Sequence, residues 1–325
     1  MADAQPLDAT FFAFRKRAQS GVLLRASLAL GIGMLVLVAV FVAALWGALA
    51  PVVVWYGDLI TAAARDPETM MIAPPPASIF LLGPAYLLFL LFAFILMAAY
   101  EAACLRWMLH GETRGFMGLS LGAETWRVYS GYWIWLAIFM GVYIALLIVV
   151  SVLAIVGAMS GDFGIGAAIG AIGLFAFLAG WLYLAVRLAP AAATSIGRGR
   201  FAFFDAWTVT KGRFWALFGA FLLIMLLMIG LGIVHSMIFA FVLLGSVFSQ
   251  LDMSVAAHDP DAFTEAMLNA IMGMLSNPTS IALLVLMQVL GMVIHLLGYV
   301  LFFGVNARAV QAALDEGKIT VAPAA

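Results

Sequence analysis

The chain has 325 residues, of which 66% are hydrophobic and 10% charged, with a formal net charge of -1 and a mean hydropathy of +1.16. Water-soluble domains hold about 45–50% apolar and about 25% charged residues, so one soluble core cannot hide this much apolar surface. The composition excludes a soluble enzyme, a nucleic-acid binder and a disordered tail, and the single cysteine excludes an intramolecular disulfide.

Six long apolar runs predict an all-α fold, a polytopic six-helix transmembrane bundle that forms a single membrane domain over residues 1–325. Each run holds roughly 20 or more mostly apolar residues, which as a helix cross roughly 30 Å of hydrocarbon. The runs are continuous rather than alternating, which excludes a transmembrane β-barrel. The predicted spans are 27–50, 78–104, 131–156, 166–190, 214–248 and 280–306.

A short aromatic segment that ends at a glycine precedes every odd-numbered span. Phe11–Phe14 leads to Gly21, Trp126–Gly131 leads into the third span, and Phe201–Gly212 leads into the fifth. Aromatic and basic side chains favour the headgroup layer, so we expect short interfacial helices on the cytoplasmic face. The repeating unit is then an entry helix followed by a hairpin of two spans, used three times. The first span exceeds the apolar core of a signal peptide, and we favour an uncleaved helix over a cleaved one.

Two ionisable side chains lie near the same ends of the second and fourth spans, Glu101 and Arg187. Either they form an ion pair across the bundle, or each extends to its own headgroup layer. A pair would fix the helix register rather than perform chemistry. Glycines spaced four and seven residues apart on the fourth span predict close packing against another helix of this chain or of a second copy. These glycines are Gly166, Gly170, Gly173 and Gly180.

The connection between the fourth and fifth spans is basic and aromatic. We expect it to attract anionic lipid at the cytoplasmic face, at about 1 kcal/mol per basic residue, which gives attachment rather than specific recognition. The fifth run is longer than one crossing requires, so it is tilted, kinked or continued past the membrane. The basic residues of the connection are Arg198, Arg200, Lys211 and Arg213.

Four polar side chains on the sixth span are spaced seven, four and seven residues apart. At about 100° per residue they share one face of the helix, and we expect this polar stripe to face the bundle interior. We favour hydrogen bonding between packed helices as its role. The alternative is a polar lining for a pathway or a lipid headgroup, in which His295 can change charge near neutral pH. The polar stripe consists of Gln288, His295, Tyr299 and Asn306.

The charges predict how the bundle is oriented in the membrane. All but Arg65 of the 15 lysine and arginine residues fall on one side of the predicted spans, and acidic residues gather in the opposite connections. The positive-inside rule therefore places both termini in the cytoplasm.

The segments Arg187–Pro190 (RLAP) and Phe204–Trp215 (FDAWTVTKGRFW) resemble a recurring block of bacterial polytopic membrane proteins. These include the membrane domain attached to some glycerophosphoryl diester phosphodiesterases, and its stand-alone relatives. The similarity covers about the second half of the chain. It implies a six-helix membrane domain in the bacterial cytoplasmic (inner) membrane. It does not imply hydrolase activity, because the chain ends soon after the last span, without the soluble catalytic barrel.

Motifs of established chemistries are missing or out of context. The sequence has no phosphate-binding glycine-rich loop and no His-Glu-x-x-His. Gly118–Gly122 has the Gly-x-Ser-x-Gly spacing, but a nucleophile elbow needs a strand before it and a helix after it, so we expect a flexible loop. We expect neither a cofactor nor a metal, because His235 and His295 lie at different depths and the acidic residues of 258–265 suit a solvated loop.

We favour a non-enzymatic integral membrane protein with an organising or regulatory role, because intramembrane polar groups are few and glycine packing seams are present. The alternative is a transporter or flippase for a lipid or hydrophobic small molecule, which would use the polar stripe. A membrane-embedded enzyme would need a nucleophile–base pair that the sequence does not offer. The expected partners are membrane lipids, anionic on the cytoplasmic face, and not nucleic acid. A homo-oligomer and a complex with another membrane protein both stay open.

Overall fold

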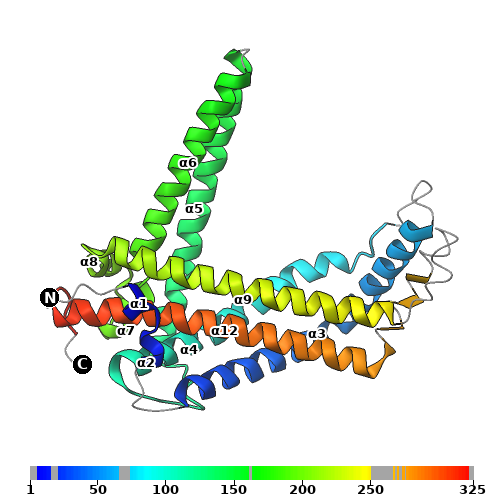
Figure 1. The fold of residues 1–325 in the computed structure, drawn as a ribbon, viewed down its shortest axis with the longest axis horizontal. Coiled ribbons are helices and arrows are strands. Elements are labelled where there is room, and N and C mark those ends of the chain that lie inside the picture. The colour runs from blue at the N-terminus through cyan, green and yellow to red at the C-terminus, as the bar shows by residue number, and fades with distance from the viewer. Residues whose placement is uncertain are drawn as a thin grey trace. The chain divides into compact units, whose positions relative to one another are not determined.

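The computed structural model describes residues 6–15, 21–65, 74–160, 163–249, 266–267, 269–270, 273–274 and 276–321. Six helices in these residues are long and apolar enough to cross a membrane, which confirms the predicted all-α six-helix bundle (Figure 1). They are α3 (Val22–Arg65), α4 (Ile79–His110), α5 (Ala123–Ser160), α6 (Phe163–Leu188), α9 (Phe214–Phe248) and α12 (Pro278–Asp315). The shorter helices are α1 (Pro6–Thr10), α2 (Phe12–Arg15), α7 (Ala191–Gly197), the 3-10 helix η1 (Phe203–Asp205) and α8 (Ala206–Thr210).

Several helices extend beyond the predicted spans. The fifth span coincides with α9, whereas α12 continues past the predicted end at residue 306 to Asp315. Helix α3 continues past the predicted end at residue 50 and through Pro51 as far as Arg65. A proline removes one backbone hydrogen bond, but membrane helices tolerate this because neighbouring groups and small local adjustments satisfy the freed carbonyl.

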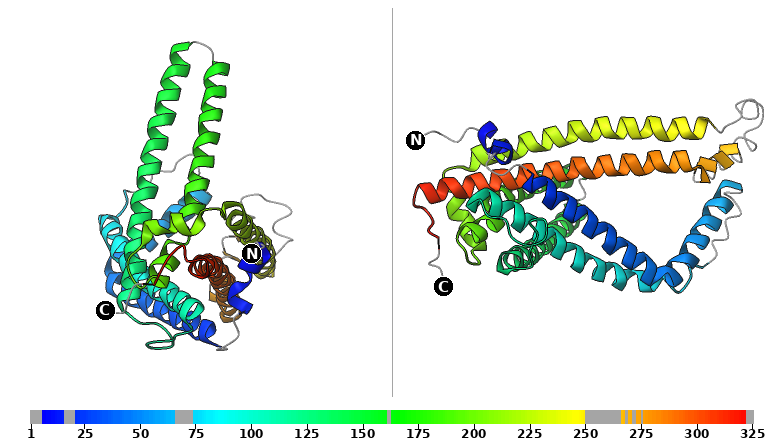
Figure 2. Two further views of the ribbon diagram at one scale, coloured as in Figure 1. Left: turned by 90° about the vertical axis from the view of Figure 1, so that its left-hand side faces the viewer. Right: turned by 90° about the horizontal axis from the view of Figure 1, so that it is seen from below.

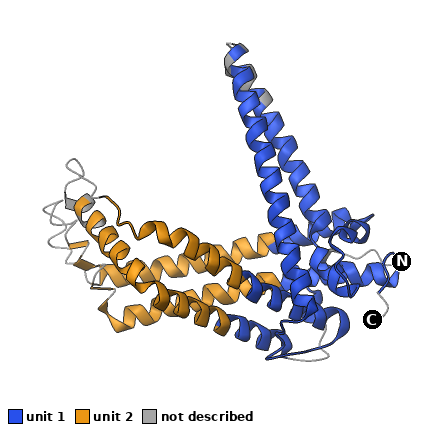
Figure 3. Cartoon of the chain, turned by 180° about the vertical axis from the view of Figure 1, so that it is seen from behind, with its two compact units in different colours: residues 1–31, 94–224, 300–325 blue, residues 32–93, 225–299 orange. Residues whose placement is uncertain are grey.

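Contacts divide the chain into two compact units (Figure 3). Unit 1 holds residues 1–31, 94–224 and 300–325, and unit 2 holds residues 32–93 and 225–299. Helices α3, α4, α9 and α12 contribute to both units, while α5 and α6 belong to unit 1. Because four helices pass from one unit into the other, the units are not separate segments of chain. The single membrane domain over the whole chain therefore stays a prediction.

Unit 1 contains the largest fully buried side chains. Tyr100 and Leu105 of α4, Phe203 of η1 and Val310 of α12 are among them. A Cβ atom on Gly197 of α7 would lie 2.7 Å from Val310, so this glycine lets α7 pack directly on α12. Helices α5 and α6 run side by side as an antiparallel hairpin (Figures 1 and 2). The core of unit 1 thus gathers where the basic ends of the spans meet the short helices.

Unit 2 is held by contacts between paired helices. Helices α9 and α12 lie side by side (Figure 2), and a Cβ atom on Gly298 of α12 would lie 2.9 Å from the Met228 side chain of α9. On α3 and α4, the rings of Phe41 and Phe89 pack edge to face with 5.3 Å between their centroids. Small residues and aromatic edges therefore set the helix contacts of this unit.

Entry helices precede two of the three odd-numbered spans. Helices α1 and α2 precede α3, and η1 and α8 precede α9. Gly21 and Gly212 turn the chain into the following helix with φ values of 93° and 79°, in the left-handed region that glycine adopts without strain. The third expected entry helix, Trp126–Gly131, instead forms the first turns of α5. A Cβ atom on Gly131 would lie 3.7 Å from the Phe203 ring. This glycine therefore serves the packing of α5 on η1 rather than a turn.

Candidate functional site

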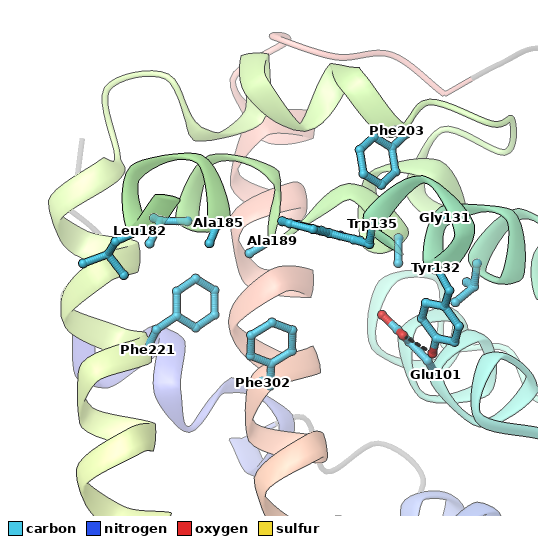
Figure 4. Close-up of a pocket in the computed structure, with 13 residues that line it drawn as sticks. Glu101, Gly131, Tyr132, Trp135, Leu182, Ala185, Ala189, Phe203, Phe221 and Phe302 are labelled. Atoms are coloured by element: carbon cyan, nitrogen blue, oxygen red, sulfur yellow. Dashed lines mark hydrogen bonds between the residues drawn. The ribbon is translucent and has the colours of Figure 1, made fainter. Parts of the chain in front are cut away.

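An apolar pocket of about 380 Å³ lies inside unit 1 (Figure 4). The space arises because small residues line part of the wall: alanines of α6, of the turn after it and of α7, and Gly131 of α5. Longer side chains at these positions would fill the pocket. Trp135 of α5 closes one side, with its ring packed edge to face on Trp181 at 6.2 Å and on Phe203 at 6.1 Å. Phe302 of α12 lines the pocket from a distant part of the chain. The pocket therefore forms only when unit 1 is folded, because residues of the five long helices α4, α5, α6, α9 and α12, together with α7 and η1, build its walls.

Among the described residues that line the pocket, Glu101 of α4 is the one that carries a charged group. It is 6% exposed, and the hydroxyl of Tyr132 on α5 donates a hydrogen bond of 2.6 Å to its Oε2. In Figure 4 the other carboxyl oxygen points away from Tyr132, towards the side where Trp135 and Phe302 lie. Polar groups in an apolar environment cost free energy unless they are hydrogen-bonded. This oxygen can therefore receive a hydrogen-bond donor or a cation of a bound molecule.

Of the two alternatives for Glu101 and Arg187, the ion pair is not among the salt bridges of the described residues. The Arg187 guanidinium lies over three aromatic rings, 5.1 Å from that of Tyr183, 5.3 Å from that of Trp207 and 6.0 Å from that of Phe214. Its Nε donates to the Tyr183 hydroxyl at 3.1 Å. The physical reason is that Tyr132 supplies the donor to Glu101, while the rings stabilise the arginine cation at the end of α6 by about 0.5–2 kcal/mol each.

Three of the four basic residues predicted to contact anionic lipid already bind carboxylates. Arg198 pairs with Asp205, and Arg200 lies 3.8 Å from the same carboxylate. Arg213 pairs with a glutamate of the C-terminal segment. The fourth residue, Lys211, is exposed and has no carboxylate partner within the described ranges. These ion pairs reduce the positive charge that this face offers to lipid, and lipid contact at these four residues stays a prediction.

The polar stripe of the sixth span does not converge on an interior site. Gln288, His295 and Tyr299 are exposed in unit 2, whereas Asn306 is 1% exposed in unit 1. The expectation of an inward face is thus corrected for three of the four residues. Gly291 and Gly298 of α12 pack on α9. At about 100° per residue the polar stripe is centred about 70° from these two glycines, so it lies beside that contact rather than within it.

His235 is the histidine that joins two helices in unit 2. Its Nε2–H donates to the backbone carbonyl of Met287 on α12 at 3.0 Å, and a Cβ atom on Gly291 would lie 3.2 Å from its ring. His295 instead bonds through Nδ1 to the Gly291 carbonyl of its own helix at 2.8 Å. The part of the chain that the structure describes holds no group of three or more His, Cys, Asp or Glu that could bind a metal. The acidic residues of 258–265 lie outside the described residues.

The glycine series of α6 forms a packing seam at one point. A Cβ atom on Gly173 would lie 3.1 Å from the Leu153 side chain of α5, so the two helices approach closely there. Gly170 and Gly180 have nothing within 4 Å of the corresponding position, and Gly166 lies in the helical backbone. Glycine spacing predicts which residues share a face, but not how far the neighbouring helix follows that face.

Sequence reasoning missed the structural role of Arg106, which it counted as one of many basic residues beside the spans. Arg106 is 1% exposed and donates hydrogen bonds into the loop between α4 and α5. The loop with the Gly-x-Ser-x-Gly string is therefore fixed rather than flexible, and the Ser120 hydroxyl is held by an arginine instead of a base. The acceptors are Ser120 Oγ at 3.0 Å, Glu124 Oε2 at 3.2 Å, the Arg114 carbonyl at 3.3 Å and the Gly118 carbonyl at 3.0 Å.

Comparisons of the chain with protein-family models, with curated proteins and with solved structures found no match. The candidate site therefore rests on geometry, and the resemblance of the second half to the membrane domain of phosphodiesterases stays a prediction. That geometry is an apolar pocket with one carboxyl group, that of Glu101, in the unit whose arginines bind carboxylates near the ends of the long helices.

Proposed function

We propose that this integral membrane protein binds a hydrophobic small molecule or one lipid chain in the unit 1 pocket and acts as a transporter or flippase for it. The pocket beside Glu101 carries the proposal. Ligand sites are concave and mostly apolar, with a few placed polar groups, and they usually measure about 300–1,000 Å³. A protein that only organises its neighbours, the role we favoured from the sequence, requires no cavity of this kind.

The lining defines the chemistry of the ligand. An apolar body would fill the space between Trp135 and Phe302, and one hydrogen-bond donor or cation would meet the open oxygen of Glu101. The volume suits one acyl chain segment or a small molecule rather than a whole phospholipid. The charge distribution of the sequence supports an inner-membrane protein of bacterial type with both termini in the cytoplasm, which would place the pocket towards the cytoplasmic side.

We propose a non-enzymatic role because the polar side-chain atoms in the lining belong to Glu101, Tyr132 and Trp135 alone. A carboxyl group and a phenol can exchange protons with a ligand, but the lining offers no nucleophile paired with a base. Proton exchange at Glu101 would couple ligand movement to pH.

Native mass spectrometry of the purified chain tests this proposal. We expect the wild-type protein to carry a hydrophobic molecule from the membrane, and Ala185→Leu, which fills the pocket, to lose it. Ala176→Leu is the matched control, since Ala176 lies exposed on the same helix outside the pocket. A wild-type protein without such a molecule, or equal retention by both variants, would overturn the proposal. The rate at which the identified molecule crosses the membrane of liposomes that contain the protein then distinguishes transport from static binding.

A further inference from the structure

Arg187 is a cation at the end of a membrane span, and it has no carboxylate partner in the part of the chain that the structure describes. It is half-buried in the last turn of α6, and no aspartate or glutamate among the described residues lies within ion-pair distance. Its hydrogen bonds use Nε and one Nη nitrogen, to the hydroxyls of Tyr183 at 3.1 Å and Thr210 at 3.5 Å. The second Nη nitrogen has no hydrogen bond within the described part. By contrast, Arg106, Arg198 and other arginines of this unit bind carboxylates.

A groove of about 530 Å³ leads from Arg187 along the apolar surface between α6 and α9. Ala179 lies eight residues before Arg187 on α6, which corresponds to a length of about 12 Å along the helix. On the α9 side the groove is lined by Phe214, Trp215 and Phe218, and Trp215 is 77% exposed. Apart from Arg187 and the Tyr183 hydroxyl, the lining is therefore apolar or aromatic.

The groove has the chemistry of a phospholipid rather than of a protein segment. A guanidinium presents a planar set of N–H donors that matches the oxygens of a phosphodiester, and tryptophan favours the headgroup level of a bilayer. The rings of Tyr183 and Trp207 lie against the guanidinium and limit its orientation. An apolar groove that continues from such a cation into a membrane span can hold the first part of an acyl chain.

We propose that an anionic phospholipid binds here, with its phosphodiester at Arg187 and an acyl chain in the groove between α6 and α9. This site is separate from the pocket beside Glu101, although Leu182 lines both. The proposal does not depend on the proposed function, because the lipid at Arg187 would be a bound neighbour and not the molecule in the pocket.

The test is lipid retention by the full chain, measured by native mass spectrometry after addition of phosphatidylglycerol or phosphatidylcholine. We expect wild-type protein to retain phosphatidylglycerol in preference, and Arg187→Gln to lower its retention about five- to tenfold. Arg114→Gln is the matched control, because Arg114 is 60% exposed, pairs with Glu112 and lies outside the groove and outside the four residues predicted to contact lipid. Glu101→Gln should leave retention unchanged, which distinguishes this site from the pocket.

A second variant keeps the test independent of the packing of Arg187. Ala179→Trp fills the far end of the groove and leaves the cation and its rings in place, so it should also lower retention. Equal retention by wild type and either groove variant would overturn the proposal. Complete displacement of the lipid by inorganic phosphate would also overturn it, because it would indicate a simple anion site. A dimer that Ala179→Trp abolishes would overturn it too, because it would indicate that a second copy of the chain occupies the groove.

Discussion

Replacing Tyr132 by phenylalanine removes the hydroxyl that donates to Glu101 and keeps the ring, which packs against Phe94 with 6.0 Å between the ring centroids. The lost hydrogen bond is 2.6 Å long, and Glu101 is only 6% exposed. Hydrogen bonds inside membrane proteins average about 0.6 kcal/mol in double-mutant cycles and reach about 1.7 kcal/mol. Because the acceptor is a carboxyl group in an apolar pocket, we expect a value near the top, about 1.4 kcal/mol, or about tenfold in the unfolding equilibrium.

Equilibrium unfolding in mixed micelles or bicelles can measure this coupling. The cycle comprises wild type, Tyr132→Phe, Glu101→Leu and the double variant, because leucine removes the acceptor whereas glutamine would keep one. Tyr143→Phe is the control, since Tyr143 lies on the same helix, is 46% exposed and stacks on Phe139 through its ring. The reasoning is refuted if the coupling stays within about 0.3–0.5 kcal/mol, the usual departure from additivity of independent sites. An equal destabilisation by Tyr143→Phe would contradict it as well.

Three further predictions concern other contacts. Gly298→Leu should destabilise the protein by about 1–3 kcal/mol in the same unfolding assay, because its side chain would meet Met228, whereas Gly230→Leu, with open space at Cβ, should change little. Arg106→Leu should cost up to about 3 kcal/mol and make the loop over residues 111–122 more sensitive to protease than in wild type in detergent micelles; a loop that stays uncleaved would count against the anchoring role of Arg106. The Lys318 ammonium and the Arg213 guanidinium beside Glu316 hold the pKa of its carboxyl below the usual range. Their contact with the carboxylate therefore stabilises the fold fully at pH values above the usual carboxyl pKa, and this stabilisation is lost as the pH falls through the lowered pKa. The protection factors of residues 316–321, with the pH dependence of intrinsic amide exchange removed, should therefore fall on acidification, and protection factors that fall instead as the pH rises would contradict this sign.

The spans could be predicted from the sequence because the bilayer imposes a strong local condition. A backbone without water must satisfy its own hydrogen bonds, so each long apolar run becomes a helix. The fifth span was therefore predicted with the same bounds as α9. The first span was predicted to end at residue 50, whereas α3 runs through Pro51 to Arg65, because a proline does not have to end a helix inside a membrane.

The candidate site could not be predicted in the same way, because it depends on how each helix is rotated about its axis. When all faces of a span are apolar, the spacing of polar residues does not say which face packs. The stripe that begins at Gln288 shares one face as its spacing indicates, yet most of it is exposed. Tyr132 was assigned to the third span but had no predicted role, and its partnership with Glu101 arises from tertiary packing between α4 and α5.

The most direct test of ligand binding in the unit 1 pocket is a cryo-electron microscopy map of the wild-type protein in lipid nanodiscs. The account predicts elongated non-protein density in the unit 1 pocket, in contact with the carboxyl oxygen of Glu101 that Tyr132 does not bind. A pocket closed by the protein's own side chains, or an empty one in a map that resolves lipid elsewhere, would contradict it.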